Sequence, residues 1–315
     1  ADTLGSKSTA IGYEALAAQN FTTATDSHNT AVGHQAGKAV TTGVDNTLIG
    51  AGAGDSLTDA DYNVAIGINA LGSDTLGSRS VAVGRHALAT QNFTTATVTH
   101  NTAVGYSAGI QITTGTLNTL IGGDCGDALT VGNSNTAVGQ NALSLDTKGD
   151  LNTAIGIGAL QSQNFTTSTD SYNTAVGGFA GGSNTTGQSN TFVGGLAGNK
   201  NTTASNNVAV GINSLTANTT GTDNVAVGAN ALAASTVTGG TLNTAIGSKA
   251  LEANTAGFHL VAVGYGAQDA NTHGIRNVSM GRDSLGADTK GSYNTAIGDL
   301  ALTTQNFTTA TSSYN

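Results

Sequence analysis

The sequence has no proline, no tryptophan and a single cysteine, and only 9% of its 315 residues are charged. A globular enzyme carries roughly a quarter charged residues and a broad mix of bulky apolar side chains. Here glycine fills 45 positions and aromatic residues make up 4%, so the chain is expected to form a thin core. No apolar run approaches the roughly 20 residues of a membrane-spanning helix, which excludes such a segment.

Charge and reactive side chains exclude further classes of protein. The 19 acidic residues outnumber the 10 basic ones, for a net charge of -9, and neither sign clusters. A nucleic-acid-binding protein needs a basic stripe, so that class is excluded. The lone Cys125 excludes an intramolecular disulfide and a cysteine zinc site, and we expect it to be a small buried residue. No Ser-His-Asp order, carboxylate pair or phosphate-binding loop recurs, so we expect no enzyme activity, cofactor or metal site.

What the sequence does contain is one repeat, read seventeen times. Its anchor is a five-residue phrase: Asn or Ser, Thr or Val, a small apolar residue, Val or Ile, and Gly. Only Leu260 breaks the first position, and only Met280 replaces Val or Ile at the fourth. The whole chain, residues 1–315, therefore reads as a single repeat array. The anchors are residues 8–12, 29–33, 46–50, 63–67, 80–84, 101–105, 118–122, 135–139, 152–156, 173–177, 190–194, 207–211, 224–228, 243–247, 260–264, 277–281 and 294–298.

The spacing of the anchors predicts a solenoid. Anchor glycines are 17 residues apart, with a longer step in every fourth turn, so four turns form a block of about 72 residues. A 17-residue unit is too short for a helical-pair repeat, and its Gly, Asn and β-branched residues disfavour helix. We expect about seventeen coils of a parallel β-solenoid, each with two short strands and two turns, that bury their apolar faces by stacking.

The phrase Asn-Thr-Ala-Val-Gly-x-x-Ala-Leu, as at residues 135–143, resembles the head repeat of trimeric autotransporter adhesins, the YadA-like head. It is also similar to arrays in phage-type tail-fibre proteins that end in a self-cleaving chaperone domain. The resemblance covers all seventeen anchors, with Leu260 as the clearest departure. It implies an all-β, left-handed parallel β-roll with three chains side by side, used as a fibre or adhesive head on a cell or virion surface.

Alternation along each anchor predicts two faces. Positions two and four share one face of the strand, and position three points to the other. Position four is always Val, Ile or Met, which favours the core of the single chain. Position three is usually Ala but becomes Leu48, Leu120 and Phe192 in the third turn of successive blocks. We expect these three to pack between chains; the alternative is that they fill a wider section of the single chain's core.

The phrase Gln-Asn-Phe-Thr-Thr-Ala-Thr forms a loop in the long steps of the first three blocks and after the last anchor, at residues 19–25, 91–97, 163–169 (with Ser168) and 305–311. The loop's aromatic residue is a candidate surface contact for a sugar or a neighbouring fibre, at Phe21, Phe93, Phe165 and Phe307. The alternative is that each Phe folds back to cover its own coil. The phrase also contains an N-glycosylation sequon, at Asn20, Asn92, Asn164 and Asn306, and further sequons begin at Asn184, Asn201, Asn218 and Asn277.

We therefore predict a structural or adhesive fibre segment that is extracellular or on a virion surface. Its expected partners are further copies of itself, as a homotrimer or an end-to-end filament, and a receptor or glycan on a host surface. An ice-binding solenoid with stacked threonines and a self-assembling extracellular sheath are the alternatives. Because residues 1–6 match residues 73–78, the chain is also expected to be a window on a longer fibre.

Overall fold

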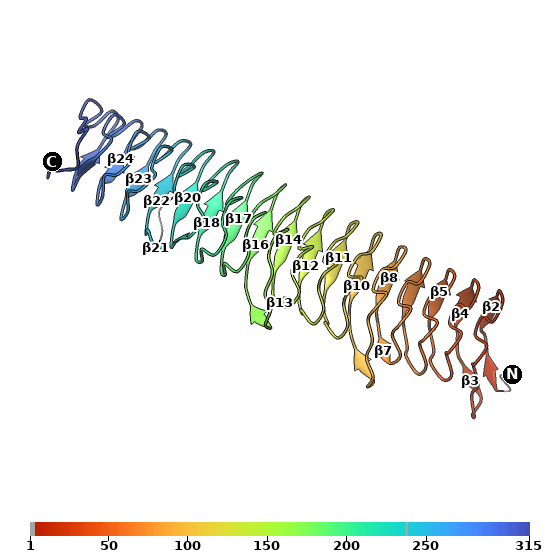
Figure 1. The fold of residues 1–315 in the computed structure, drawn as a ribbon. Helices are drawn as coiled ribbons and strands as arrows, with labels where there is room; N and C mark the ends of the chain where they lie inside the picture. The colour runs from red at the N-terminus through yellow and green to blue at the C-terminus, as the bar shows by residue number, and fades with distance from the viewer. Residues whose placement is uncertain (1–3, 237–238) are drawn as a thin grey trace. The chain divides into compact units, whose positions relative to one another are not determined.

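The computed structural model describes residues 4–236 and 239–315, which form stacked turns of β-structure without a helix (Figure 1). The prediction of an all-β parallel β-solenoid is confirmed. The chain divides into two compact units, one made of the described part of residues 1–152 with 164–170, and the other of residues 153–163 and 171–315. The first three residues, on which part of the match to residues 73–78 rests, lie outside the described residues.

Every anchor forms a three-residue strand, and within each unit successive strands pair in parallel and in register. In the first unit, for example, Thr102 lies opposite Thr119 and Val104 opposite Ile121. The first unit contains β2 (Thr9–Ile11), β4 (Thr30–Val32), β5 (Thr47–Ile49), β6 (Val64–Ile66), β8 (Val81–Val83), β10 (Thr102–Val104), β11 (Thr119–Ile121) and β12 (Thr136–Val138). The second contains β14 (Thr153–Ile155), β16 (Thr174–Val176), β17 (Thr191–Val193), β18 (Val208–Val210), β20 (Val225–Val227), β22 (Thr244–Ile246), β23 (Val261–Val263), β24 (Val278–Met280) and β26 (Thr295–Ile297).

The long steps add small parallel sheets of two-residue strands. In each, the long loop pairs with the turn before it. Figure 1 shows β7 and β13 on loops that reach beyond the neighbouring turns. The pairs in the first unit are β1 (Gly5–Ser6) with β3 (Thr25–Asp26), β7 (Gly77–Ser78) with β9 (Thr97–Val98), and β13 (Gly149–Asp150) with β15 (Thr169–Asp170). Those in the second are β19 (Gly221–Thr222) with β21 (Gly239–Gly240), and β25 (Gly291–Ser292) with β27 (Thr311–Ser312).

The predicted second strand in every turn is wrong. The segment around the Ala-Leu or Ala-Gly pair forms tight turns that hydrogen-bond to the next coil, such as Leu88 N–H to the Ala108 carbonyl at 3.1 Å. Two residues of this segment have left-handed backbone conformations, for example His86 at φ 62° and Leu88 at φ 51°. A strand requires a strongly negative φ at successive residues, so these conformations exclude one.

Close stacking requires glycine at the end of each anchor. Gly122 has φ 141°, and a Cβ atom added to it would lie 2.5 Å from the carbonyl oxygen of Gly139 in the next turn. No real Cβ atom occupies such a position, and an L-residue is strained at that φ. The anchor glycine therefore lets each coil lie directly on the next.

A buried ladder of asparagine amides runs beside the strands. The Asn118 side chain donates from Nδ2 to the Gly132 carbonyl at 2.8 Å, and its Oδ1 accepts the backbone N–H of Asn135 at 3.0 Å. The same pattern recurs from anchor to anchor and satisfies backbone groups that burial would otherwise leave unpaired. Leu260 N–H still donates to Asn243 Oδ1 at 3.0 Å, but leucine has no amide to continue the ladder.

The two faces of the strands are the reverse of the prediction. From β4 to β26, position three is buried inside the single chain, and only Ala10 in the first strand, β2, is exposed. Position four is instead partly exposed, as at Ile49 (37%) and Ile121 (39%). Leu48, Leu120 and Phe192 are 0% exposed in the single chain, so the prediction that they pack between chains is wrong. They fill the core, which was the alternative.

These large residues fit because the opposite wall of the coil loses its side chains. A Cβ atom added to Gly109 would lie 2.8 Å from Leu120 Cδ1, and one added to Gly126 would lie 2.9 Å from Leu120 Cδ2. In the fourth block the volumes are exchanged: the strand carries Ala262, while the opposite wall carries Leu251 and Gln268, all fully buried. The side-chain volume that fills the coil is thus nearly constant, whether the large side chains come from the strand or from the opposite wall.

This exchange predicts a rescue. Leu120→Ala should cost about 2–5 kcal/mol because it leaves a cavity, and Gly109→Leu with Gly126→Leu should overpack the intact core. Combining all three substitutions should recover most of the stability, because Leu251 already adopts φ 55°, close to the 60° of Gly109. Thermal unfolding followed by circular dichroism measures this, and additive losses in the combined variant would contradict it.

Candidate interaction surface

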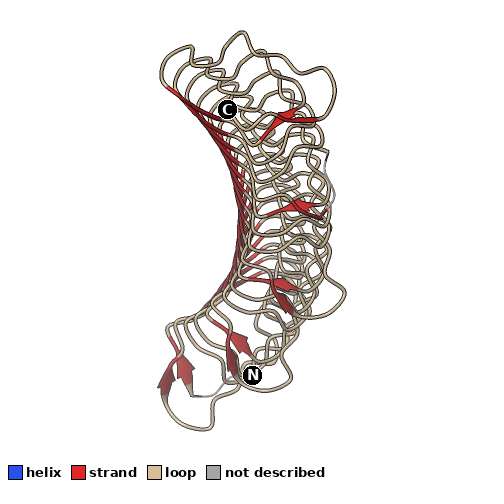
Figure 2. Ribbon diagram, turned by 90° about the vertical axis from the view of Figure 1, so that its left-hand side faces the viewer, coloured by secondary structure: helices blue, strands red, loops and turns tan. Residues whose placement is uncertain are grey.

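The main surface feature is the outward side of the stacked strands. We define the strand face as the first and third residues of each three-residue strand, which are the second and fourth positions of the anchors. Within each unit these strands lie together on one side, with the strands of the small sheets away from them (Figure 2). Because the strands stack in register, each position forms a column of like side chains.

The strand face carries no charge. Its inner column, formed by the first strand residues, is Thr in eleven strands and Val in six, and its outer column, formed by the third strand residues, is Val, Ile or Met in every strand and is therefore apolar. Several outer residues are substantially exposed, including Ile246 (40%) and Met280 (47%). Contiguous exposed apolar surface of this kind marks interaction sites in soluble proteins.

Exposed large side chains border the strand face on both edges. One edge is formed by the residues that follow the anchor glycines, and its exposed members are Tyr13, Ile68, Tyr106, Ile157, Ile212 and Tyr265. The other edge is formed by the residues that precede the anchors, with Tyr62, Leu117, Leu151, Tyr172 and Leu242 exposed. Both edges also carry arginines, three of which lie over tyrosine rings: Arg85 over Tyr106, Arg79 over Tyr62 and Arg276 over Tyr293.

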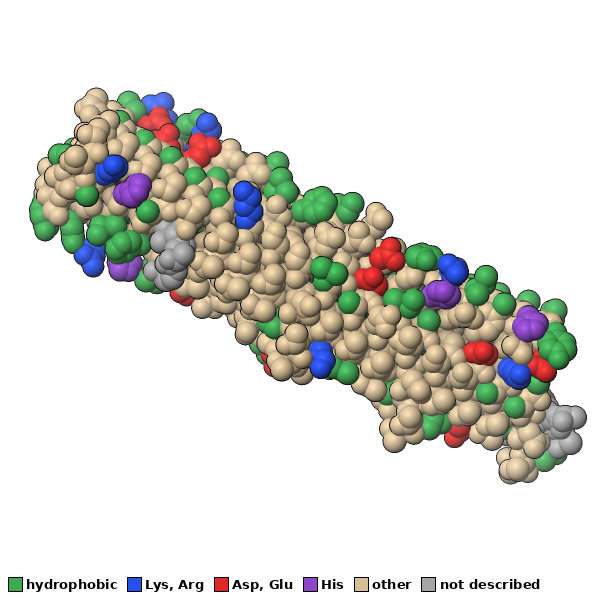
Figure 3. All heavy atoms as spheres, in the orientation of Figure 1, with side chains coloured by type: hydrophobic (Ala, Val, Ile, Leu, Met, Phe, Trp, Pro, Cys, Tyr) green, Lys and Arg blue, Asp and Glu red, His purple; other side chains and the backbone are tan. Residues whose placement is uncertain are grey.

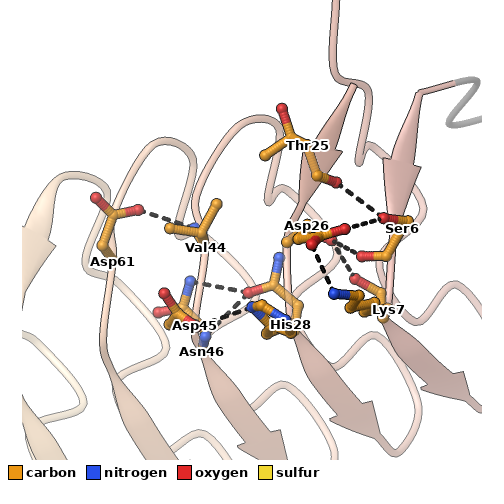
Figure 4. Close-up of polar contacts among 12 residues, drawn as sticks. Ser6, Lys7, Thr25, Asp26, His28, Val44, Asp45, Asn46 and Asp61 are labelled. Atoms are coloured by element: carbon orange, nitrogen blue, oxygen red, sulfur yellow. Dashed lines mark hydrogen bonds and ion pairs between the residues drawn. The ribbon is translucent and has the colours of Figure 1, made fainter. Parts of the chain in front are cut away.

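Charged residues lie at the edges and corners, where they link successive turns. Lys7 Nζ is 2.6 Å from Asp26 Oδ2, and His28 Nδ1 is 3.4 Å from Asp45 Oδ1 (Figure 4). The Lys7 ammonium holds the pKa of the exposed Asp26 carboxyl below its usual range. On the face drawn in Figure 3, Lys, Arg, Asp and Glu are scattered singly or in small mixed groups. Exposed pairs of this kind add little stability.

The long loops do not present their phenylalanines. Phe21, Phe93 and Phe165 are at most 7% exposed, so their prediction as surface contacts is wrong. Their burial agrees with the alternative considered above, that each Phe folds back from the surface, and Phe307 in the last long loop is half-buried.

Three of these loops are held by a buried aspartate that sequence reasoning missed. Asp74 accepts the backbone N–H of Phe93 at 3.0 Å and the Gln91 side-chain amide at 2.6 Å. Asp146 and Asp288 accept the corresponding Phe165 and Phe307 N–H groups at 3.1 Å. The recurrence of Asp at one phase of the block, 19 residues before each of these phenylalanines, was the available signal.

A second column of threonines is engaged in hydrogen bonds between turns. Thr113 Oγ1 donates to the Thr130 carbonyl at 3.1 Å, and Thr130 Oγ1 donates to the Thr147 carbonyl at 2.9 Å. These hydroxyls serve the stacking of the coils. The ice-binding alternative needs a flat array of threonine hydroxyls that are free to bind water, and the hydroxyls of this column are already hydrogen-bonded to the next turn.

The reactive and acidic side chains do not converge on a site. The described residues include no group of three or more His, Cys, Asp and Glu that could hold a metal ion. A cleft of about 520 Å³ in the first unit is lined mainly by polar residues, among them Asp55, Asn69 and His86. Burial raises the pKa of the Asp55 carboxyl. Cys125 is fully buried, with its thiol donating to the Ala137 carbonyl at 3.2 Å.

No protein-family model matches this chain, and no curated protein matches it at a significant level. Among the described residues, no helix has the length and apolar character needed to cross a membrane.

Cys125 offers a test of the packed interior. Burial raises the pKa of its thiol from 9.0 to about 12, and only the thiolate reacts with alkylating reagents. At pH 8 the folded chain should therefore react with iodoacetamide at least about a thousandfold more slowly than the unfolded chain. The preference for the protonated thiol stabilises the fold below about pH 9 and is lost as the pH rises toward 12. Comparable alkylation rates in urea and in buffer would contradict the buried placement.

Proposed function

We propose that this chain is a structural segment of a fibre, part of an extracellular or virion-surface appendage such as an adhesive head or a tail fibre. Three parallel copies pack through their strand faces. The fold is compatible with a structural role, because a stacked β-solenoid repeats one surface at every turn. The uncharged strand face, with its apolar outer column, is the observation that carries the proposal.

Three features of that face support self-association. The residues of its outer column are apolar. The face carries no charged residue, although charged residues occur on both of its edges. Its columns consist of similar side chains, Val, Ile and Thr, stacked in register. A second copy presents the same columns at the same spacing, about 4.8 Å between turns, so the chain is complementary to itself. The resemblance to trimeric adhesin heads favours three copies.

The mass in solution tests the assembly. Native mass spectrometry or light scattering should give about three times 30.9 kDa. A chain that stays monomeric at micromolar concentration while retaining its β-structure would rule the trimer out.

Substitutions on the strand face test the interface itself. Ile66 and Ile121 are 36% and 39% exposed in the single chain, so each tolerates a polar replacement better than a core residue does. The double variant Ile66→Asp with Ile121→Asp should dissociate at least tenfold more readily, because burying unpaired charges between chains costs several kcal/mol.

The matched control places the same two charges elsewhere. Val98 and Leu145 are 52% and 53% exposed and lie outside the strand face, so Val98→Asp with Leu145→Asp should leave the trimer intact. Equal dissociation of both double variants, or loss of β-structure in the strand-face variant before any dissociation, would count against this interface.

A further inference from the structure

The eight Asn-X-Ser/Thr sequons fall into two structural groups. Those at Asn184, Asn201, Asn218 and Asn277 are at most 1% exposed. Their amide nitrogens are engaged, as in Asn201 Nδ2 to Asn184 Oδ1 at 2.8 Å and Asn277 Nδ2 to the Gly291 carbonyl at 2.8 Å. These asparagines serve the interior of the coil, and no enzyme reaches them in the folded chain.

The other four asparagines are exposed, and each lies in the Asn-Phe-Thr phrase of a long loop: Asn20, Asn92, Asn164 and Asn306. The loop holds its asparagine at the surface by burying both neighbours. At Asn92, for example, Gln91 is 0% exposed and Phe93 is 7% exposed, and both are hydrogen-bonded to Asp74.

The side chain of the exposed asparagine is oriented by its oxygen. Thr75 Oγ1 donates to Asn92 Oδ1 at 3.2 Å, and the same contact recurs from Thr147 to Asn164 at 3.1 Å and from Thr289 to Asn306 at 3.3 Å. Within the part of the chain that the structure describes, the Asn92 Nδ2 has no hydrogen-bond partner. The threonine two residues further on, Thr94, is exposed as well. The nitrogen that a glycan would occupy is therefore the atom left facing solvent.

We propose that these four loops are acceptor sites for N-linked sugars in the folded chain. The Asn Nδ2 forms a bond to C1 of a sugar carried on a phosphate-activated donor, the bond from C1 to the phosphate oxygen breaks, the phosphate leaves, and one amide proton is released. In the first unit the acceptors recur every 72 residues, or every four turns, which places them about 19 Å apart. The small sheets lie away from the strand face (Figure 2), so bulky sugars on these loops leave that face free.

Two classes of donor supply a phosphate-activated sugar: sugar nucleotides and lipid-pyrophosphate-linked oligosaccharides. Two arms of one experiment distinguish them. In the first arm, the purified full chain is incubated with UDP-glucose and an asparagine glucosyltransferase, both folded and after unfolding in urea and dilution. In the second, the purified full chain, again both folded and after unfolding in urea and dilution, is incubated with an oligosaccharyltransferase and a lipid-pyrophosphate-linked oligosaccharide. Peptide mapping by mass spectrometry gives the occupancy of each asparagine.

The expected result is sugar on Asn20, Asn92, Asn164 and Asn306 of the folded chain, with the buried sequons modified only after unfolding. Modification in the first arm alone points to a nucleotide-activated donor, and in the second alone to a lipid-linked one. Thr94→Ala should abolish sugar at Asn92, whereas Thr95→Ala, which changes an equally exposed neighbour outside the sequon, should retain it. A folded chain that takes no sugar on these loops in either arm, or that is modified equally at its buried sequons, overturns the proposal.

Discussion

Direct, in-register stacking of each turn on the next is the constraint on which the rest of this structure depends. Glycine ends each anchor because a Cβ atom at a position such as Gly122 would enter the carbonyl group of the next turn. In-register stacking also places every side chain beside its own equivalent, so a position tolerates only residues that pack against copies of themselves. Asparagine meets this demand in the interior, since its amide donates within one turn and accepts from the next, as Asn118 does. Threonine hydroxyls meet it at the corner of the coil in the same way.

The second constraint is the volume of a very thin core. Only one strand residue per turn points inward, and it faces one position on the opposite wall. Where that wall is Leu, the strand carries Ala; where it is Gly in two successive turns, the strand carries Leu120 or Phe192. The fourth block reverses the arrangement with Leu251 and Gln268. The four-turn period is therefore a packing pattern inside one chain. The large side chains come from the strand in some blocks and from the opposite wall in another, while the total side-chain volume inside the coil stays nearly constant.

That pattern explains what the sequence could and could not predict. The 17-residue period, the parallel stacking and the long steps follow from counting anchors, because stacking in register demands strict periodicity. Which strand face is inside does not follow from alternation, since both faces are apolar here. If the larger apolar residues are assigned to the core, Val and Ile at position four are placed inside. That assignment is wrong here, because the narrow interior of the coil has room mostly for Ala. The decisive signal was present in the covariation of Leu48, Leu120 and Phe192 with glycines on the opposite wall. For Phe93, the buried Asp74 that anchors its loop lies in the preceding turn, and only the fold shows that the two meet.

Because position three points inward and position four outward, the proposed interface is formed by larger apolar side chains than the sequence led us to expect. If Val and Ile at position four were core residues, the outward columns would be Ala, whose small side chains offer little surface to a partner. With Ala inside, the outward columns are Thr, Val, Ile and Met, and these present far more apolar area per turn. High β-propensity alone does not account for this choice, because tyrosine and arginine are tolerated directly after the anchor glycine, two residues beyond the strand, at Tyr106 and Arg85. Charge is excluded from two adjacent columns while both edges accept it, which supports the proposal that another chain covers this surface. The glycosylation sequons are arranged in the opposite way. Those in the coil are buried and hydrogen-bonded, and the exposed ones lie on loops away from the strand face. The proposed sugars and the proposed interface would therefore use separate sides of each unit.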